Sequence, residues 1–349
     1  MNIVRYGGIA GIGVAVLALI GGVLWYGGGT LSKTVAVKNG GEKAPLETQE
    51  TGAGGERLAY NPLTGTMCAD GDARPFAVML AADKVARPLY GIAQADIVVE
   101  MPALTNGITR YMGIFACGHA DEIGSIRSSR HDFLYFAKSF DAIYAHWGGS
   151  YLALDALKTK ELDNIDAMPN PYDAFYRRSD KLAPHNGFTS FERLKETAQK
   201  LGYRMEGRSP GYPRIIDEAV LNTDQNIALG YPFPYNVDFF YDHATNSYFR
   251  SRGGEKEMDA GTNTQAEVKN VIVMEAASRQ VSPDYNDMDV EGEGNAIVYR
   301  NGEMKKGTWK REGERYVFSD GTGQAIGLVA GKTWISVIQP DQKVELTFK

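Results

Sequence analysis

The chain has 349 residues, of which 43% are hydrophobic, 11% aromatic and 23% charged, and its formal net charge is −6. This balance is typical of a globular protein with a packed core and argues against general disorder. The acidic charge and the lack of a long block of Lys and Arg argue against nucleic acid as the main partner.

The first predicted element is an apolar segment over residues 9–26, which is long enough to cross a bilayer core. Arg5 precedes this segment, and Trp25 and Tyr26 mark its far edge. We therefore expect a single transmembrane helix in the cell membrane, with residues 1–8 as a cytoplasmic tail and the body of the protein outside the cytoplasm. A cleaved signal peptide is the alternative interpretation.

Residues 27–57 are rich in Gly, Thr, Lys and Glu and predict a flexible stalk. The body that follows holds both cysteines of the chain, Cys68 and Cys117. Outside the cytoplasm these two residues could form a disulfide. Alternatively, Cys117 is a small hydrophobic residue at the end of a buried strand and Cys68 has no special role. The sequence leaves both interpretations open.

Residues 58–213 predict an α/β domain with a mixed sheet, because strand and helix patterns alternate and Asn106-Gly107 indicates a hairpin. Near-continuous apolar runs indicate that the strands are buried. The predicted strands are 76–82, 96–103, 108–117 and 142–147, and the predicted helices are 132–139, 150–159 and a third one that ends near Gly202.

Residues 214–349 predict a smaller, mainly β domain, because short strand-like runs are separated there by turns such as Asn301-Gly302. These runs lie at 237–250, 268–275, 294–300, 306–318 and 332–337.

The stretch around Arg127 and Arg130 is the strongest candidate for a binding site. The two arginines flank Ser128 at the point where the chain is expected to enter a helix. On one helical face, two guanidinium groups could hold a phosphate or carboxylate group. The alternative is a pair of surface arginines that bridge to Asp132 or Glu122.

Arg110 begins the third predicted strand, and we expect it to converge with these two arginines. Glu100 lies on the adjacent strand of the predicted hairpin and could pair with Arg110. This Glu–Arg pair would be either structural or part of the site.

Two histidines complete the predicted site. His146 ends an apolar strand, where ligands gather in α/β sheets, although a buried structural histidine would also fit there. A turn at Gly148-Gly149 follows, and then Ser150, which is either a ligand contact or the N-cap of the next helix. His185 and Asn186 lie in a loop and could supply an acid/base group and a polar contact; the alternative is a simple turn.

No metal site or cofactor is predicted. The five histidines show no paired spacing with cysteine, or with one another, that suits zinc. No catalytic residue is assigned either, because the Gly-Gly-Ser turn does not fit the Gly-x-Ser-x-Gly motif of serine hydrolases.

A series of motifs, in order over residues 60 to 340, resembles the YerB-like family of bacterial lipoproteins. The motifs include Asn61-Pro62-Leu63-Thr64-Gly65, Arg74-Pro75-Phe76-Ala77-Val78-Met79, the Ile123–Ser150 stretch, Ala183-Pro184-His185-Asn186 and Gly331-Lys332-Thr333-Trp334-Ile335. The resemblance implies a two-domain extracytoplasmic protein. It implies no reaction, because the function of both domains in that family is unknown. An apolar anchor replaces the lipid-modified cysteine of the family's lipoproteins.

We therefore expect a cationic, histidine-containing pocket in the first domain that binds an anionic cell-envelope ligand or another envelope protein. The alternative is an envelope hydrolase or glycopolymer transferase with His146 or His185 as acid/base. The Ser125–Arg130 segment is faintly similar to the LytR-CpsA-Psr enzymes, which use arginines on the phosphates of a lipid-linked substrate.

Overall fold

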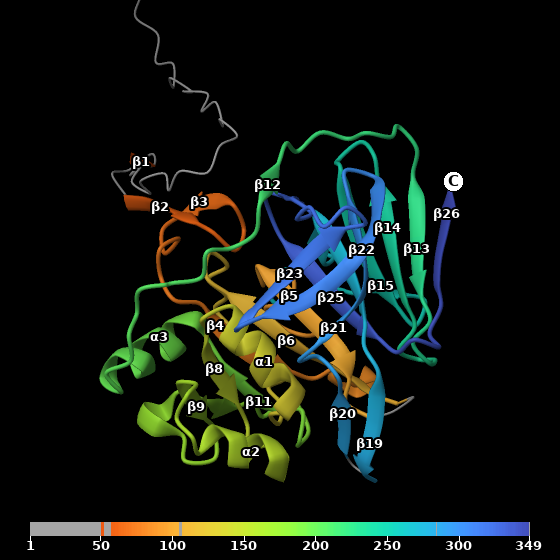
Figure 1. Ribbon diagram of the computed structural model, residues 1–349. Coiled ribbons are helices and arrows are strands. Elements are labelled where there is room, and N and C mark those ends of the chain that lie inside the picture. Colours follow the sequence, from red (N-terminus) through yellow and green to blue (C-terminus); the bar gives the residue numbers. More distant parts are fainter. Residues whose placement is uncertain (1–49, 52–56, 105–106, 284, 349) are drawn as a thin grey trace, which may run out of the picture. The chain divides into compact units, whose positions relative to one another are not determined.

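The structure is a computed structural model that describes residues 50–51, 57–104, 107–283 and 285–348 (Figure 1). The predicted tail, the apolar segment 9–26 and most of the stalk lie outside the described residues. Within the described ranges, none of the helices is long and apolar enough to span a membrane. The described residues belong to one compact unit, which is mostly sheet.

A ten-stranded sheet runs through this unit in the order β23-β22-β21-β18-β25-β5-β6-β4-β8-β9. It is mixed, because β18/β25, β25/β5, β4/β8 and β8/β9 are parallel pairs and the other pairs are antiparallel. Its strands are β4 (Phe76–Leu80), β5 (Ile97–Pro102), β6 (Thr109–Phe115), β8 (Ile143–His146), β9 (Asn164–Asp166), β18 (Asn270–Glu275), β21 (Glu293–Arg300), β22 (Glu303–Glu312), β23 (Arg315–Asp320) and β25 (Thr333–Ile338).

The two halves of the chain, which the sequence predicts as separate domains, share this sheet. Strand β25 from the C-terminal half pairs with β5 from the N-terminal half, with Thr333 opposite Ile97 and Ser336 opposite Glu100. Parallel strands are not joined by a local turn, so the sequence near either strand does not predict that β25 and β5 pair.

Both faces of the sheet are covered, which explains the near-continuous apolar strands. Along β4, Phe76 and Val78 pack into one apolar cluster, while Ala77 and Met79 pack into the other. The helices α1 (His131–Ser139) and α2 (Tyr151–Leu157) cover the second cluster, and α3 (Phe191–Lys200) packs on the first.

A second sheet, in the order β16-β15-β14-β13-β26 with β17 paired to β15, also packs on the first cluster, for example through Phe239 and Ile227 (Figure 1). Its strands are β13 (Gln225–Leu229), β14 (Val237–Asp242), β15 (Ser247–Arg252), β16 (Glu255–Lys256), β17 (Glu267–Val268) and β26 (Val344–Phe348).

The remaining elements are short strands and turns. A hairpin of β19 (Ser278–Ser282) and β20 (Tyr285–Met288) contacts α1. The others are β1 (Glu50–Thr51), β2 (Arg57–Asn61), β3 (Thr66–Cys68), β7 (Ile123–Gly124), β10 (Tyr176–Arg177), β11 (Gly187–Thr189), β12 (Arg214–Ile215), β24 (Leu328–Val329) and the 3-10 turns η1 (Lys84–Ala86) and η2 (Pro171–Asp173).

The three predicted helices are present, and local sequence explains two of their beginnings. The Ser150 side chain accepts a hydrogen bond from the backbone N–H of Ala153, and the Ser190 side chain accepts one from Arg193. Both serines are therefore N-caps.

The structure contains a disulfide between Cys68 and Cys117, whose Cα atoms are 5.6 Å apart. It fastens β3 to the residue just beyond the end of β6. Of the two interpretations that the sequence leaves open, the structure has the disulfide.

Candidate functional site

A cavity of about 330 Å³ lies at the turn end of the β5–β6 hairpin, beside the start of α1. Arg110, Arg127 and Arg130 all line it, so the structure places the three predicted arginines on one cavity. The other lining residues are Asp83, Ala103, Leu104, Ile108 and Tyr285.

Backbone hydrogen bonds hold the arginine segment in place. The N–H of Arg127 donates to the carbonyl of Met79 at the end of β4 (2.9 Å), and the carbonyl of Arg127 accepts from Trp147 beyond the end of β8 (3.1 Å). The segment therefore crosses the ends of two neighbouring strands. Ser129 next forms a bridge with Gly149. A Cβ at Gly149 would lie 3.0 Å from the Ser129 Cβ, so a larger residue there would press against Ser129.

The cavity carries excess positive charge. Its three guanidinium groups face one carboxylate, Asp83, whose Oδ2 lies 3.7 Å from Nη2 of Arg127. The Nε atoms of all three arginines are buried and have no hydrogen-bond partner among the described residues. Arg110 is only 5% exposed. Burial, together with the nearby Arg130 and Arg127, lowers the pKa of Arg110 to about 9.

Two further contacts orient the arginines. Nη1 of Arg110 donates to the carbonyl of Ser128 (3.2 Å), and the guanidinium of Arg130 lies over the Tyr285 ring, 5.1 Å from its centroid. These contacts use only part of the donor capacity of each guanidinium, which has five N–H groups. An anion in the cavity would supply both the missing acceptors and the missing negative charge.

Glu100 does not pair with Arg110, and this expectation was wrong. Glu100 stands opposite Tyr111 across the β5–β6 ladder, whereas Arg110 stands opposite Met101. Because side chains alternate between the faces of a sheet, Glu100 and Arg110 point to opposite faces.

Glu100 instead belongs to a buried ionic cluster beneath the second sheet. Its Oε2 accepts from Nη2 of Arg250 (2.6 Å), and its Oε1 accepts from the Thr109 hydroxyl (2.8 Å). Arg250 also bonds to Glu257, and Arg252 lies 3.7 Å from Glu100. Burial acts to raise the pKa of Glu257, but Arg250 and Arg252 outweigh it and hold that pKa below its usual value. This cluster of two acids and two arginines is balanced in charge and stands apart from the cavity lining.

His146 is buried and is not one of the cavity-lining residues. Its Nδ1 lies 2.8 Å from the carbonyl oxygen of Gly148, its Nε2 lies 3.3 Å from Oδ1 of Asn164, and its ring stacks on Tyr144. Gly148 adopts a φ of +58°, and its N–H donates to Asp166 (2.8 Å). The predicted strand-end histidine is therefore part of the packing around the Gly148-Gly149 turn.

His185 is half-buried near the arginines without lining the cavity. Burial lowers the pKa of His185, and the positive charge of Arg127 lowers it further. The side-chain oxygen of Asn186 accepts a hydrogen bond from Nη1 of Arg177 (2.6 Å). This oxygen is therefore engaged in a contact within the protein.

Several residues at or beside the cavity could not be assigned to a site from the sequence, and Asp132 was expected only as an alternative ion-pair partner of the arginines. Tyr285 reaches the cavity from β20, far along the chain from Arg130. Beside it, His131, Asp132 and Asp287 form a cluster: Nε2 of His131 lies 3.0 Å from Oδ1 of Asp132 and 3.1 Å from Oδ1 of Asp287. Burial, reinforced by the charge of Asp287, raises the pKa of Asp132 to about 8.

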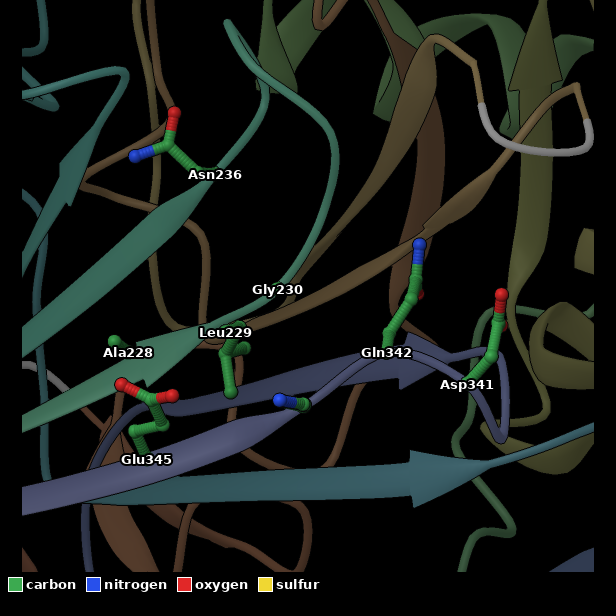
Figure 2. Close-up of a pocket in the computed structure, with 8 residues that line it drawn as sticks. Ala228, Leu229, Gly230, Asn236, Asp341, Gln342 and Glu345 are labelled. Atoms are coloured by element: carbon green, nitrogen blue, oxygen red, sulfur yellow. The ribbon is translucent and has the colours of Figure 1, made fainter.

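A second hollow of about 440 Å³ lies along β13 and β26. Figure 2 shows Asp341 and Gln342 at one end of it and Glu345 at the other, so its polar side chains do not converge. Its lining mixes Lys343 with two acids, and the N–H of Gly230 already donates to the carbonyl of Lys343. The arginine cavity is therefore the better candidate site.

Comparison with known proteins identifies relatives over most of the chain. Residues 63–204 match the model described as "Protein of unknown function (DUF3048) N-terminal domain", and residues 227–335 match the corresponding C-terminal domain. The chain is 30% identical over 289 residues to "Putative lipoprotein YerB" of Bacillus subtilis (strain 168). The matched region covers 80% of this chain and 86% of that protein. The crystal structure of YerB protein from Bacillus subtilis superposes with a TM-score of 0.75 and 28% identity, over 82% of this chain and 99% of that one.

Proposed function

Because this chain belongs to the YerB family, whose two domains have no established function, we propose a role from its own site. The proposed role is that of an envelope protein that binds an anionic cell-envelope ligand in the arginine cavity. The apolar segment 9–26 would anchor it in a single pass, with the body outside the cytoplasm.

One observation carries the binding proposal: three arginines share a cavity with one carboxylate, and the Nε–H of each arginine is buried without a partner within the described part of the chain. Buried donors normally find acceptors, and buried like charges repel one another. Such an arrangement costs free energy in the empty protein and suits a bound anion, which guanidinium groups can hold in a bidentate manner.

Two observations support an extracytoplasmic body. The relative from Bacillus subtilis is described as a lipoprotein, which is a membrane-associated class. The Cys68–Cys117 disulfide is of a kind that persists mainly in oxidising compartments.

Binding is favoured over catalysis. The cavity-lining residues that the structure describes include no histidine, serine or cysteine, and Ser129 and Ser150, which are hydrogen-bonded to each other through their backbones, have other roles. The Ser129 hydroxyl accepts from the Tyr144 hydroxyl (2.8 Å), and Ser150 caps α2. His146 is held in the packing described above, and neither it nor His185, the two acid/base residues of the alternative function, lines the cavity.

The chemical character of the ligand follows from the lining. The guanidinium groups favour a phosphate or carboxylate, while Ala103, Leu104 and Ile108 offer an apolar wall. An anionic group attached to a larger, less polar body fits both surfaces.

A thermal-shift screen of the full chain in lipid nanodiscs tests this function. The panel contains inorganic phosphate, sugar phosphates, muropeptides and teichoic-acid fragments. A ligand-dependent rise in melting temperature is expected for the wild type and not for the Arg127→Ala/Arg130→Ala variant. Arg208→Ala, which removes an exposed arginine outside the cavity, serves as the control and should respond like the wild type. Equal shifts in all three proteins would refute the cavity as the binding site.

A further inference from the structure

The cluster of His131, Asp132 and Asp287 adjoins the arginine cavity on two elements. Arg130 lines the cavity at the start of α1, and His131 and Asp132 follow it directly. Tyr285 lines the cavity on β20, and Asp287 lies two residues further on the same strand. Because alternate residues of a strand share a face, Tyr285 and Asp287 lie on the same side of β20. The cluster and the cavity therefore share a wall.

The cluster lacks positive charge of its own. Two carboxylate oxygens converge on one ring nitrogen, Nε2 of His131, which can carry only one proton. Asp132 is 2% exposed, and the remaining protein contact to its Oδ1 is the backbone N–H of Met288 (3.3 Å). Glu291 adds a further negative charge nearby, where it accepts from the Tyr135 hydroxyl. A buried carboxylate in such surroundings holds a proton, which a bound cation can displace.

The spacing suits a metal ion. Two ligand atoms that each lie about 2.1 Å from a metal and subtend a right angle are about 3.0 Å apart. The separations of Nε2 from the two carboxylate oxygens are 3.0 and 3.1 Å. One imidazole nitrogen with two carboxylate oxygens is a ligand set for a first-row divalent cation, with the other coordination positions open.

The carboxylates are also held in position from outside. Arg279 bonds to Oδ2 of Asp287, which leaves Oδ1 directed at His131. Such outer contacts orient ligands in metal sites. The adjoining cavity separately suits an anion, because the 95%-buried Arg110 has an Nε–H without a partner in the described ranges.

We propose that His131, Asp132 and Asp287 bind a divalent cation beside the arginine cavity, and that the cavity holds a phosphate group bound together with this cation. The second half of this statement rests on the proposed function. The charges favour phosphate over carboxylate: three arginines against Asp83 leave two positive charges in the cavity lining, and the cation adds positive charge beside it. A phosphate monoester carries between 1.5 and 2 negative charges at neutral pH, whereas a carboxylate carries one.

The test uses the full chain in nanodiscs and Mn²⁺ as the probe. Calorimetric titration should show one site in the wild type, weakened at least about tenfold in Asp287→Asn and in His131→Gln. Asp224→Asn is the matched control, because Asp224, Asp242 and His243 form a similar but more exposed cluster elsewhere. Circular dichroism checks that each variant is folded.

A second titration adds inorganic phosphate to each protein with and without Mn²⁺. Paramagnetic broadening of the ³¹P signal that Asp287→Asn loses would support the joint site. Phosphate binding without a Mn²⁺ site would overturn the cation proposal and leave the proposed function standing. Mn²⁺ binding without phosphate binding would uphold the cation site and refute the phosphate assignment, while the ligand screen described above decides the function of the arginine cavity. Mn²⁺ affinity equal in the wild type, Asp287→Asn and His131→Gln would place the ion elsewhere and overturn the cation proposal.

Discussion

Glu100 and Arg110 lie on adjacent antiparallel strands and point to opposite faces of the central sheet. Glu100 faces the buried cluster with Arg250 and Arg252, and Arg110 faces the cavity with Arg127 and Arg130. The same hairpin thus separates a charge-balanced cluster, in which every arginine has an acidic partner, from a cavity with surplus positive charge. This contrast is the reason for assigning stability to one face and binding to the other.

Replacing Glu100 should therefore affect stability and not binding. Glu100→Ala leaves Arg250 and Arg252 buried with one acid fewer, which should cost about 3–5 kcal/mol in the free energy of unfolding. Urea denaturation measures this change, and phosphate affinity should remain at the wild-type value. As a control, Glu161→Ala removes an exposed ion pair with Lys138 and should leave stability unchanged. A loss of phosphate affinity in a folded Glu100→Ala protein would show that Glu100 contributes to the binding site.

The disulfide should contribute to stability by restricting the unfolded chain. Cys68 and Cys117 are 49 residues apart, and a loop of this size corresponds to about 2–4 kcal/mol. Denaturation of Cys68→Ser/Cys117→Ser should show this loss, and reductant should destabilise the wild type alone. An unchanged denaturation midpoint in the double variant would contradict the expectation.

His185 reports on the charge of the cavity. Its pKa is lowered by burial and then by Arg127, so the unfolded chain takes up this proton at a higher pH than the folded protein does. Its contribution to stability is therefore complete above the unfolded pKa of about 6.5 and declines as the pH falls towards the folded value. NMR titration should show the pKa of His185 rising in Arg127→Ala, and also in the wild type when phosphate binds. A pKa that neither change moves would separate His185 from the cavity.

Substitutions of Ser150 distinguish its role as a helix cap from a role as a ligand contact. Because its hydroxyl accepts from the Ala153 N–H, Ser150→Ala should lower the free energy of unfolding by about 1 kcal/mol, and Ser150→Gly by only a few tenths. Both variants should bind phosphate as the wild type does. Weaker binding in a folded Ser150→Ala protein would argue for a direct contact.

Much of the fold could be predicted from local patterns, because apolar runs and helix caps depend on residues that are close in sequence. The buried run that became β4 and the serine that caps α2 are visible in the sequence. The placement of β25 beside β5 is not, because parallel neighbours need no shared turn. The residues of the site also differ in whether the sequence predicts them. Arg127 and Arg130 are close in sequence, whereas Tyr285 is brought to them only by the folded β20 hairpin.

The error at Glu100 has a definite cause. The sequence indicates a hairpin between β5 and β6, but its register decides which residues share a face. A shift of one residue would place Glu100 beside Arg110, and only the observed pairing of Glu100 with Tyr111 excludes this. For His146 the sequence left a ligand-site and a structural interpretation open. Its position at a strand end is visible in the sequence, whereas the contacts to Gly148 and Asn164 that occupy its ring are not.

The central claim is that the surplus charge of the arginine cavity holds a phosphate group, and the most direct test is the calorimetric affinity of the full chain for a phosphate monoester. Arg127→Lys keeps the charge but loses the planar donor pair, and Arg127→Ala/Arg130→Ala loses two charges. Affinity should fall from wild type to Arg127→Lys and fall further, by at least about a hundredfold, in the double variant, while Arg208→Ala should bind normally. Equal affinity in all four proteins would contradict the central claim.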